Sequence, residues 1–479
     1  MKKSLLIRIT ITLVLLLTVM LIPATPVKAL DVNLKSAAIG TGTDVLDATV
    51  TWTDVVDDGD GAGAATANVN TSTEAGDKIL VVASFDAEET KAMVGTFRIR
   101  DNDSTSFSSE FNRELTGPAK VNDSGIGSIV QIFTSEDGND IFTLQHYTTV
   151  ASMTTSATIV AIPLATSEGP LPYGEVYRTT TDTVEGSSAW EEVGDDASTP
   201  TTCRTGAVTL GKAAHIYVTA SIESQQSGGG TQIGSWKLQY STDNFSTAGI
   251  DLDVTMDRSF AGNNDKGLMG LVGLLQSQEP GSYYFRVMHM GTGTGVATNK
   301  VSLVAVGLED GSHYLQAWKI TPSSDTTSST TLEGVTGGSV TFTPDVSSSD
   351  LFMHAQYQIS ADDVSTATYD ILVDKLVDYD TQDEHRFIAS GTDTGSGVSV
   401  GLTSTSNTLH TLALRHAIND NLKTLTTSNV ALVGFAMGYD TETPPIPEWP
   451  TYLLVGSGMV LVVVYFWFRR NRAIATNSR

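Results

Sequence analysis

The sequence predicts an all-β protein made of three tandem β-sandwich domains, and three observations lead to this fold class. Short runs of alternating apolar and polar residues, bounded by Gly, Asp, Ser and Thr, recur along the middle of the chain, as expected for strands and turns. No long stretch in this region shows convincing helical periodicity. Similar segments also recur at nearly constant spacing, which indicates an internal repeat.

Three β-branched and aromatic runs define the repeat. They are KILVVASF at 78–85, HIYVTASI at 215–222 and LFMHAQYQI at 351–359. A hydrophobic position precedes each run, at separations of 138 and 142 residues, namely Trp52, Trp190 and Leu332. A strand ending in histidine lies before the close of each unit, at His146, His289 and His416. We therefore expect copies of one domain at 30–168, 169–311 and 312–440, with several cores in series in a chain of 479 residues.

Each unit has the size of a jelly roll, since roughly 130 to 140 residues with about eight short strands suit that closed sandwich. Copy three carries TTLEGVTGGSVTFTPDV, then YDILVDK and NTLHTLALRHAINDN. This order resembles a jelly-roll module of exported surface proteins and tail-fibre-type proteins, distantly similar to the TNF and C1q fold. The resemblance is weaker in copies one and two. It implies binding or display rather than a chemistry.

The first 29 residues have the layout of a secretory signal peptide. A cationic start, MKKSLLIR, precedes an apolar run and the small-residue end PATPVKA, so we expect cleavage after Ala29. An uncleaved signal anchor is the alternative, which Pro23 and Pro26 disfavour because they suit a cleavage region.

The exported part is strongly acidic. Eight of the 28 basic residues lie in the leader and the tail, and all but one of the 54 acidic residues lie between them, so residues 30–446 carry a net charge of −33. Such a surface repels phosphate backbones, and we expect no nucleic-acid partner. Cys203 is the single cysteine, so no internal disulfide forms; an inert buried thiol is favoured over pairing between chains.

No segment offers a credible nucleophile and base, and we predict that the protein is not an enzyme. One histidine per copy is too few for a zinc site, so His146, His289 and His416 are expected to be structural. The string Asp-Thr-Gly-Ser at 393–396 occurs once, whereas an aspartic protease needs two such aspartates. The run GTGTG at 291–295 leads into no helix that would hold phosphate.

Acidic loops are candidates for binding calcium, the one cofactor that the sequence suggests. Asp57, Asp58 and Asp60 lie around glycines in DVVDDGDGAG, and calcium prefers such oxygen ligands on a tight turn. The spacing is not that of an EF-hand, and a solvated acidic loop is the favoured alternative. Four Asn-X-Ser/Thr sequons are candidates for glycosylation, at Asn70, Asn102, Asn122 and Asn244.

The tail predicts a membrane segment. A Pro-rich spacer at 441–450 precedes 18 uncharged residues at 451–468, followed by a basic end at 469–479 that contains Arg469, Arg470 and Arg472. As a helix the uncharged run would span roughly 27 Å, enough for a bilayer core. The positive-inside rule leaves the basic end in the cytoplasm and the repeats outside.

The order of a Pro-Glu motif, an apolar helix and an arginine cluster resembles the sorting signals of the PEF-CTERM and PEP-CTERM families. The motif residues are Pro447, Glu448, Trp449 and Pro450, with Trp449 where the PEF-CTERM pattern usually has Phe. The resemblance implies that a membrane sorting protease of the exosortase or archaeosortase class cleaves near this motif and transfers the chain to another anchor. A plain stop-transfer anchor is the alternative.

The leading functional hypothesis is an envelope-anchored, non-enzymatic surface protein that forms a coat, builds a matrix or makes adhesive contacts with other surface proteins. The second is a carbohydrate-binding array in which aromatics such as Trp190, Trp236 or Trp318 stack on glycans, with core packing as their alternative role. The third and least favoured is a glycan-active hydrolase with carboxylates in the acidic loops.

Overall fold

The computed structural model describes residues 38–438 except for short segments. These are 47–48, 56–65, 70–73, 90–92, 103–105, 116–122, 137–139, 149–152, 167–168, 185–188, 195–201, 228–229, 231, 261–264, 294, 309–314, 321–323, 345–348, 362–364, 374–382, 388–393 and 407. All regular secondary structure in the described part is β-strand, which confirms the all-β class. The expected leader, spacer, membrane segment and basic tail lie outside the described residues. Within the described part, no helix is long and apolar enough to cross a bilayer.

Repeat 1 is a sandwich of two antiparallel sheets. Its strands are β1 (Ala38–Leu46), β2 (Thr49–Asp54), β3 (Thr66–Val69), β4 (Lys78–Glu89), β5 (Met93–Asp101), β6 (Phe111–Leu115), β7 (Asp123–Thr134), β8 (Asp140–Thr148) and β9 (Met153–Pro163). One sheet has the order β1-β9-β4-β7 and the other β2-β8-β5-β6, with β3 also paired to β8. Neighbours in these sheets are mostly not neighbours in the chain, and this interlocked Greek-key order is that of a jelly roll.

Repeats 2 and 3 have the same strand order. Repeat 2 contains β12 (Tyr173–Arg178), β13 (Asp182–Thr183), β14 (Glu191–Glu192), β15 (Val208–Leu210), β16 (Ala214–Gln226), β17 (Gln232–Ser241), β18 (Ile250–Phe260), β19 (Lys266–Gln278), β20 (Gly281–Gly291) and β21 (Val296–Leu308). Repeat 3 contains β22 (Leu315–Ile320), β23 (Asp325–Thr327), β24 (Glu333–Phe342), β25 (Ser349–Ala361), β26 (Ser365–Val373), β27 (Asp383–Phe387), β28 (Thr394–Thr405), β29 (His410–Ile418) and β30 (Leu425–Gly438). The sheet orders are β12-β21-β16-β19 with β14-β20-β17-β18, and β22-β30-β25-β28 with β24-β29-β26-β27. The short pair β10 (Ala165–Thr166) and β11 (Gly169–Pro170) links repeats 1 and 2.

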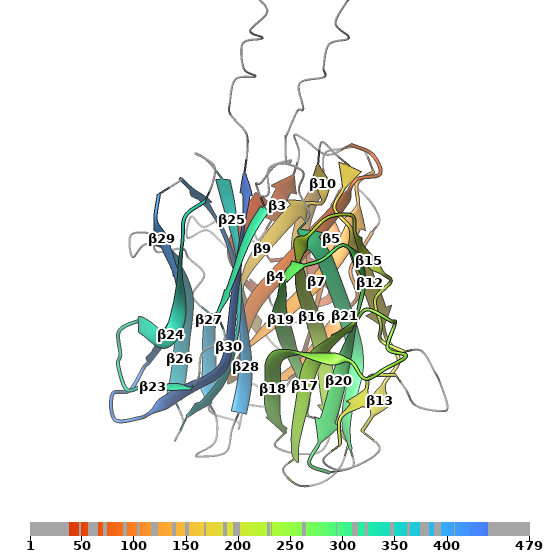
Figure 1. Cartoon of the computed structure of the whole chain (residues 1–479). Coiled ribbons are helices and arrows are strands. Elements are labelled where there is room, and N and C mark those ends of the chain that lie inside the picture. The colour runs from red at the N-terminus through yellow and green to blue at the C-terminus, as the bar shows by residue number, and fades with distance from the viewer. Residues whose placement is uncertain are drawn as a thin grey trace, which may run out of the picture. The chain divides into compact units, whose positions relative to one another are not determined.

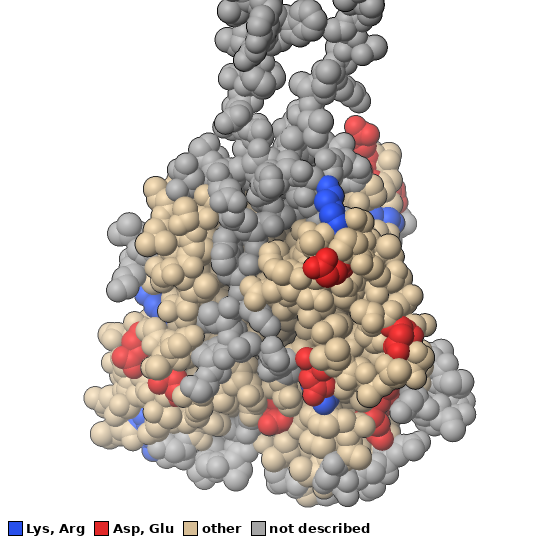
Figure 2. Space-filling model, in the orientation of Figure 1, with Lys and Arg blue, Asp and Glu red and all other residues tan. Residues whose placement is uncertain are grey.

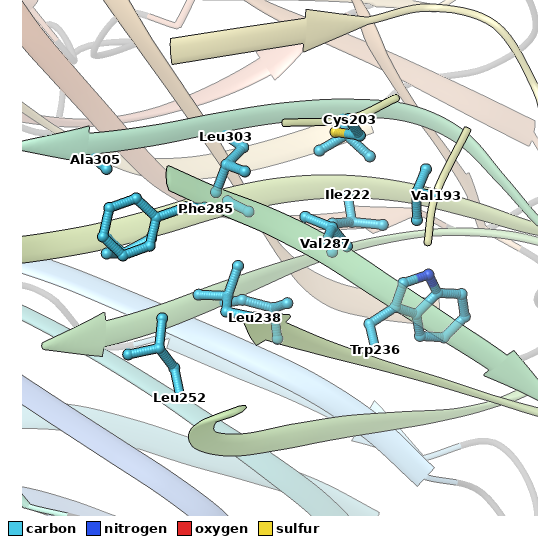
Figure 3. Close-up of a cluster of buried hydrophobic side chains, with 14 of the residues drawn as sticks. Val193, Cys203, Ile222, Trp236, Leu238, Leu252, Phe285, Val287, Leu303 and Ala305 are labelled. Carbon is cyan, nitrogen blue, oxygen red and sulfur yellow. The ribbon is translucent and has the colours of Figure 1, made fainter. Parts of the chain in front are cut away.

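Each sandwich has its own apolar interior. In repeat 2 that interior includes Trp236, Phe285 and Leu303, all fully buried between the two sheets (Figure 3). The cores of repeats 1 and 3 are built alike but each also takes in a residue from another repeat, Leu268 and Ile126 respectively. The three sandwiches are therefore not structurally independent domains.

A further core joins the three repeats. We call the sheet that contains β1, β12 or β22 the inner sheet of its repeat, and the other the outer sheet. The inner sheets bury a shared cluster that draws on all three repeats, including the equivalent residues Leu80, Tyr217 and Phe352. Residues 32–439 consequently form a single compact unit, rather than only the cores in series that the sequence suggested.

The repeats contact one another in a closed ring. Strand β6 of repeat 1 lies against β19 of repeat 2, β18 of repeat 2 against β28 of repeat 3, and β27 of repeat 3 against β7 of repeat 1. Figure 1 shows the three colour ranges packed side by side. One kind of head-to-tail interface, used three times, closes on itself as in a cyclic trimer. The single chain is thus a pseudo-threefold assembly.

Polar contacts repeat around the ring. The Oγ of Ser84 accepts a hydrogen bond from Val400 N–H at 3.3 Å, and the equivalent Gln356 accepts one from Val272 N–H. The third equivalent, Ser221, lies 3.4 Å from Ser128 of repeat 1. Each contact joins an inner-sheet strand to the next repeat in the same rotational sense.

Candidate functional site

Each repeat buries one Asp–His–Thr cluster at the same place in the sandwich. The clusters are Asp44–His146–Thr155, Asp182–His289–Thr298 and Asp325–His416–Thr427. The distance from His Nδ1 to Thr Oγ1 is 2.9, 3.0 and 2.8 Å in repeats 1, 2 and 3. The distance from His Nε2 to the Asp carboxylate is 3.0, 3.3 and 3.5 Å.

The clusters tie the two sheets of each sandwich together. The histidine comes from β8, β20 or β29 of the outer sheet, while the threonine and aspartate come from strands of the inner sheet. An aromatic residue pairs with each histidine in the neighbouring outer-sheet strand, namely Phe97, Trp236 and Tyr369. Two of these extend the network, because Trp236 Nε1 donates to Thr298 at 2.8 Å and the Tyr369 hydroxyl lies 2.7 Å from Thr427.

Burial sets the charge state of the clusters. It lowers the pKa of His146 and of His416, against the opposing effect of the nearby carboxylates. Burial alone would raise the pKa of Asp182, but the neighbouring His289 imidazole at 3.3 Å and the hydrogen bond from the Gly194 N–H lower it. The neutral imidazole is therefore favoured in repeats 1 and 3, and the carboxylate in repeat 2.

The clusters resemble a hydroxyl–imidazole–carboxylate triad, but their position excludes catalysis by them. A nucleophile must reach its substrate, whereas none of the three threonines is more than 1% exposed. Each histidine is buried and lies within hydrogen-bond distance of a buried threonine. The sequence interpretation missed their partners, although a threonine follows each histidine by 9, 9 and 11 residues.

Replacing His146 with leucine is expected to destabilise the protein by at least about 2 kcal/mol, because Asp44 and Thr155 lose a buried partner. The free energy of unfolding from urea titrations measures this change. As a control, His215→Leu removes the bond from the N–H of Ser277, an exposed residue near the end of β19, and a loss below about 1 kcal/mol is expected. Equal losses in the two variants would contradict a structural role for the cluster.

A second repeated feature lies on the outer sheets. Arg98 lies 4.0 Å from the ring centre of Trp52, and Lys237 lies 4.4 Å from that of Trp190. The cations occupy equivalent positions on β5 and β17, because each follows the partner of the cluster histidine. Cation–π contact of this kind fixes the aromatic ring on the surface.

These contacts bear on the predicted sugar-stacking aromatics. Trp236 is fully buried in the core of repeat 2, which removes it from the candidates because core packing determined its position. Trp190 has one face covered by Lys237, whose ammonium is held by Asp251 at 2.8 Å. The side chain of Trp318 lies outside the described residues.

Of the four sequon asparagines, Asn102 and Asn244 lie in the described part. The Nδ2 atom of Asn102 donates to Thr143 at 2.7 Å, so the nitrogen that a glycan would occupy is engaged. Asn244 is exposed on the turn after β17 and has a φ of 54°. The next residue, Phe245, also has a positive φ of 59° and rests 4.2 Å from the Arg286 guanidinium. Asn70 and Asn122 lie outside the described residues.

The remaining predicted sites fall mainly outside the described part. Asp57, Asp58 and Asp60 lie there, as do Ala29, the 447–450 motif and the arginines after 468. Among the described residues, no group of three His, Cys, Asp or Glu side chains is placed to hold a metal ion. Cys203 is buried in the core of repeat 2, and burial raises the pKa of its thiol to about 12, as expected for an inert thiol.

On the face in Figure 2, charged side chains are scattered among uncharged residues. The described surface on this side therefore has no single charged patch that would mark a site. The repeated features of the described part are instead the Asp–His–Thr clusters and the cation–π pairs.

No protein-family model matches the chain, and no curated protein is significantly similar to it. Solved structures that match the chain include the Eiger TNF of S. frugiperda, at 13% identity over 30% of this chain and 95% of that one, with a TM-score of 0.19. A tandem CBM22 domain of Xyn10C from Paenibacillus barcinonensis is 12% identical over 57% of this chain and 95% of that one, with a TM-score of 0.17. A triple jelly-roll protein from the turret of an archaeal virus is 12% identical over 84% of this chain and 91% of that one, with a TM-score of 0.18. Values this low carry no argument about function, and the jelly-roll assignment rests on the strand order.

Proposed function

We propose that this chain is an exported, non-enzymatic surface protein whose ring of three jelly rolls faces outward from an envelope anchor. The observation that carries the proposal is the order of the C-terminal segments: the Pro-Glu motif, the uncharged run 451–468 and the arginine cluster. That order follows β30, the last strand of the described part, which ends at Gly438. A coat, a matrix or an adhesive contact is the role that such a body would serve.

The architecture of the body supports display rather than chemistry. The histidines and threonines of the three Asp–His–Thr clusters are buried, and the outer-sheet cations are held by aromatic rings and a carboxylate of the same repeat. Groups that are already paired inside a protein have little to offer a reacting substrate. A body with three related outer sheets suits repeated contacts with neighbouring molecules.

A carbohydrate-binding array remains the second hypothesis. It now depends on Trp52, Trp190 and Trp318, because Trp236 is core. A glycan array with the soluble body distinguishes the two functions, since display as a coat requires no glycan signal above background.

The anchor is tested by mass spectrometry of C-terminal peptides from native membranes. Processing by a sorting protease predicts that peptides covering 451–479 are missing from the mature protein and that the last peptide ends within 447–450. The matched variant Glu448→Ala is expected to retain the full tail, because the motif is what the protease would read. Recovery of an intact 451–479 segment from the unaltered protein would reduce the tail to a plain membrane anchor.

A further inference from the structure

The centre of the ring contains a polar layer inside an otherwise apolar joint. Three equivalent inner-sheet positions face it with Val82, Thr219 and His354, and the next three with Ser84, Ser221 and Gln356. All six side chains are at most 1% exposed. Repeat 3 thus contributes two large polar side chains where repeat 1 has valine and serine. A polar group taken from water must find a partner or destabilise the fold.

His354 is bonded on one side only. Its Nδ1 lies 2.5 Å from the Tyr217 hydroxyl of repeat 2. We assign the Tyr217 O–H as the donor to Nδ1, which places the ring proton on Nε2. That Nε2 is buried and has no hydrogen-bond partner among the described residues.

Gln356 is likewise hydrogen-bonded at one end of its side chain only. Its Oε1 accepts from the backbone N–H of Val272 in repeat 2, which assigns the other end of the amide as the donor. Its Nε2 is also buried, again without a partner in the part of the chain that the structure describes. Two buried donors, on alternate residues of β25, therefore end at the same joint with no acceptor from the described residues.

We propose that the polar layer binds one small hydrogen-bond acceptor, a water molecule or a halide ion, between His354 Nε2 and Gln356 Nε2. Alternate residues of a strand point to the same face, and their Cα atoms lie about 6.6 Å apart. One acceptor between two such side chains would accept a hydrogen bond of about 3 Å from each. The acceptor satisfies donors that would otherwise each destabilise the folded state.

The site is specific to repeat 3, so one acceptor binds per chain. The equivalents of the two donors are Val82 and Ser84 in repeat 1, and Thr219 and Ser221 in repeat 2. None of these four side chains carries an N–H group. The acceptor is an asymmetric element in a pseudo-symmetric ring.

Crystals of the protein grown in sodium bromide and in sodium acetate test the proposal. A density peak within hydrogen-bond distance of both nitrogens is expected in each crystal. Anomalous scattering from bromine at the peak identifies a halide ion, whereas a peak without it in both crystals identifies water. The absence of any peak, or a peak bonded to one nitrogen only, would overturn the proposal.

A double variant gives a matched control. His354→Val with Gln356→Ser reproduces the residues of repeat 1, and it is expected to lose the peak while keeping the ring. If a halide ion is bound, the unaltered protein is expected to have a higher Tm in bromide than in acetate. The double variant is expected to have the same Tm in both salts. A peak that persists in the double variant would show that the two donors do not hold the acceptor.

Discussion

Replacing Glu223 with alanine is expected to lower the free energy of unfolding by about 3–5 kcal/mol, because it removes one partner of a buried ion pair. Glu223 is 1% exposed. Its carboxylate accepts from the Asn112 backbone N–H of repeat 1 at 2.7 Å and from Asn299 at 3.3 Å, and it lies 3.2 Å from Lys300. The variant leaves the Asn112 N–H at the joint of repeats 1 and 2 without its acceptor, and it leaves Lys300 with the Glu110 carbonyl but without its carboxylate partner. Urea unfolding measures the loss.

Hydrogen exchange locates the effect. Because Glu223 holds β6 through Asn112, faster exchange is expected at Phe111–Leu115 in the variant, with little change in β27. Glu110→Ala is the matched control, since Glu110 is an exposed carboxylate 3.6 Å from Arg98, and exposed pairs contribute about 1 kcal/mol or less. Similar losses for the two variants would mean that this contact does not hold the ring together.

The strands were predictable from the sequence because their patterns are local. On β5, alternate side chains of MVGTFRIRD are buried, as expected for an outer sheet with one face in water. The runs KILVVASF and VSLVAVGL are apolar at consecutive positions instead. In β4 both Val81 and Val82 are fully buried, one in the core of repeat 1 and the other in the shared core. A continuous apolar run was thus a signal that both faces of the inner sheet are covered.

The closure of the ring could not be predicted in the same way. It depends on which edge of one sandwich meets the inner sheet of the next, and residues such as Asn112 and Glu223 meet across 111 positions of the chain. The Asp–His–Thr clusters show the same limit. Three aligned histidines were visible in the sequence, but the approach of Asp44 to His146 follows from the pairing of strands in two different sheets.

Acid is expected to destabilise the ring through His354. Burial lowers the pKa of this histidine to about 3, whereas an unfolded histidine has a pKa of about 6.5. Between these values the unfolded chain binds a proton that the folded chain does not, so stability falls as the pH decreases. Above pH about 6.5 the histidine is neutral in both states and does not lower the free energy of unfolding. As the pH falls from there toward 3, the free energy of unfolding decreases by about 1.4 kcal/mol per pH unit.

The test compares the pH dependence of stability with and without the imidazole. His354→Val carries the residue of repeat 1, and although it leaves the Tyr217 hydroxyl without its acceptor, that loss is the same at every pH. The difference in unfolding free energy between variant and unaltered protein is therefore expected to shift by about 1.4 kcal/mol for each unit between pH 6 and 4.5. His146 and His416 also have lowered pKa values, but both remain in the variant and cancel in the comparison. A pH-independent difference would mean that His354 is protonated in the folded ring, and the aromatic joint formed by Tyr217 and Phe352 would then have to accommodate an imidazolium.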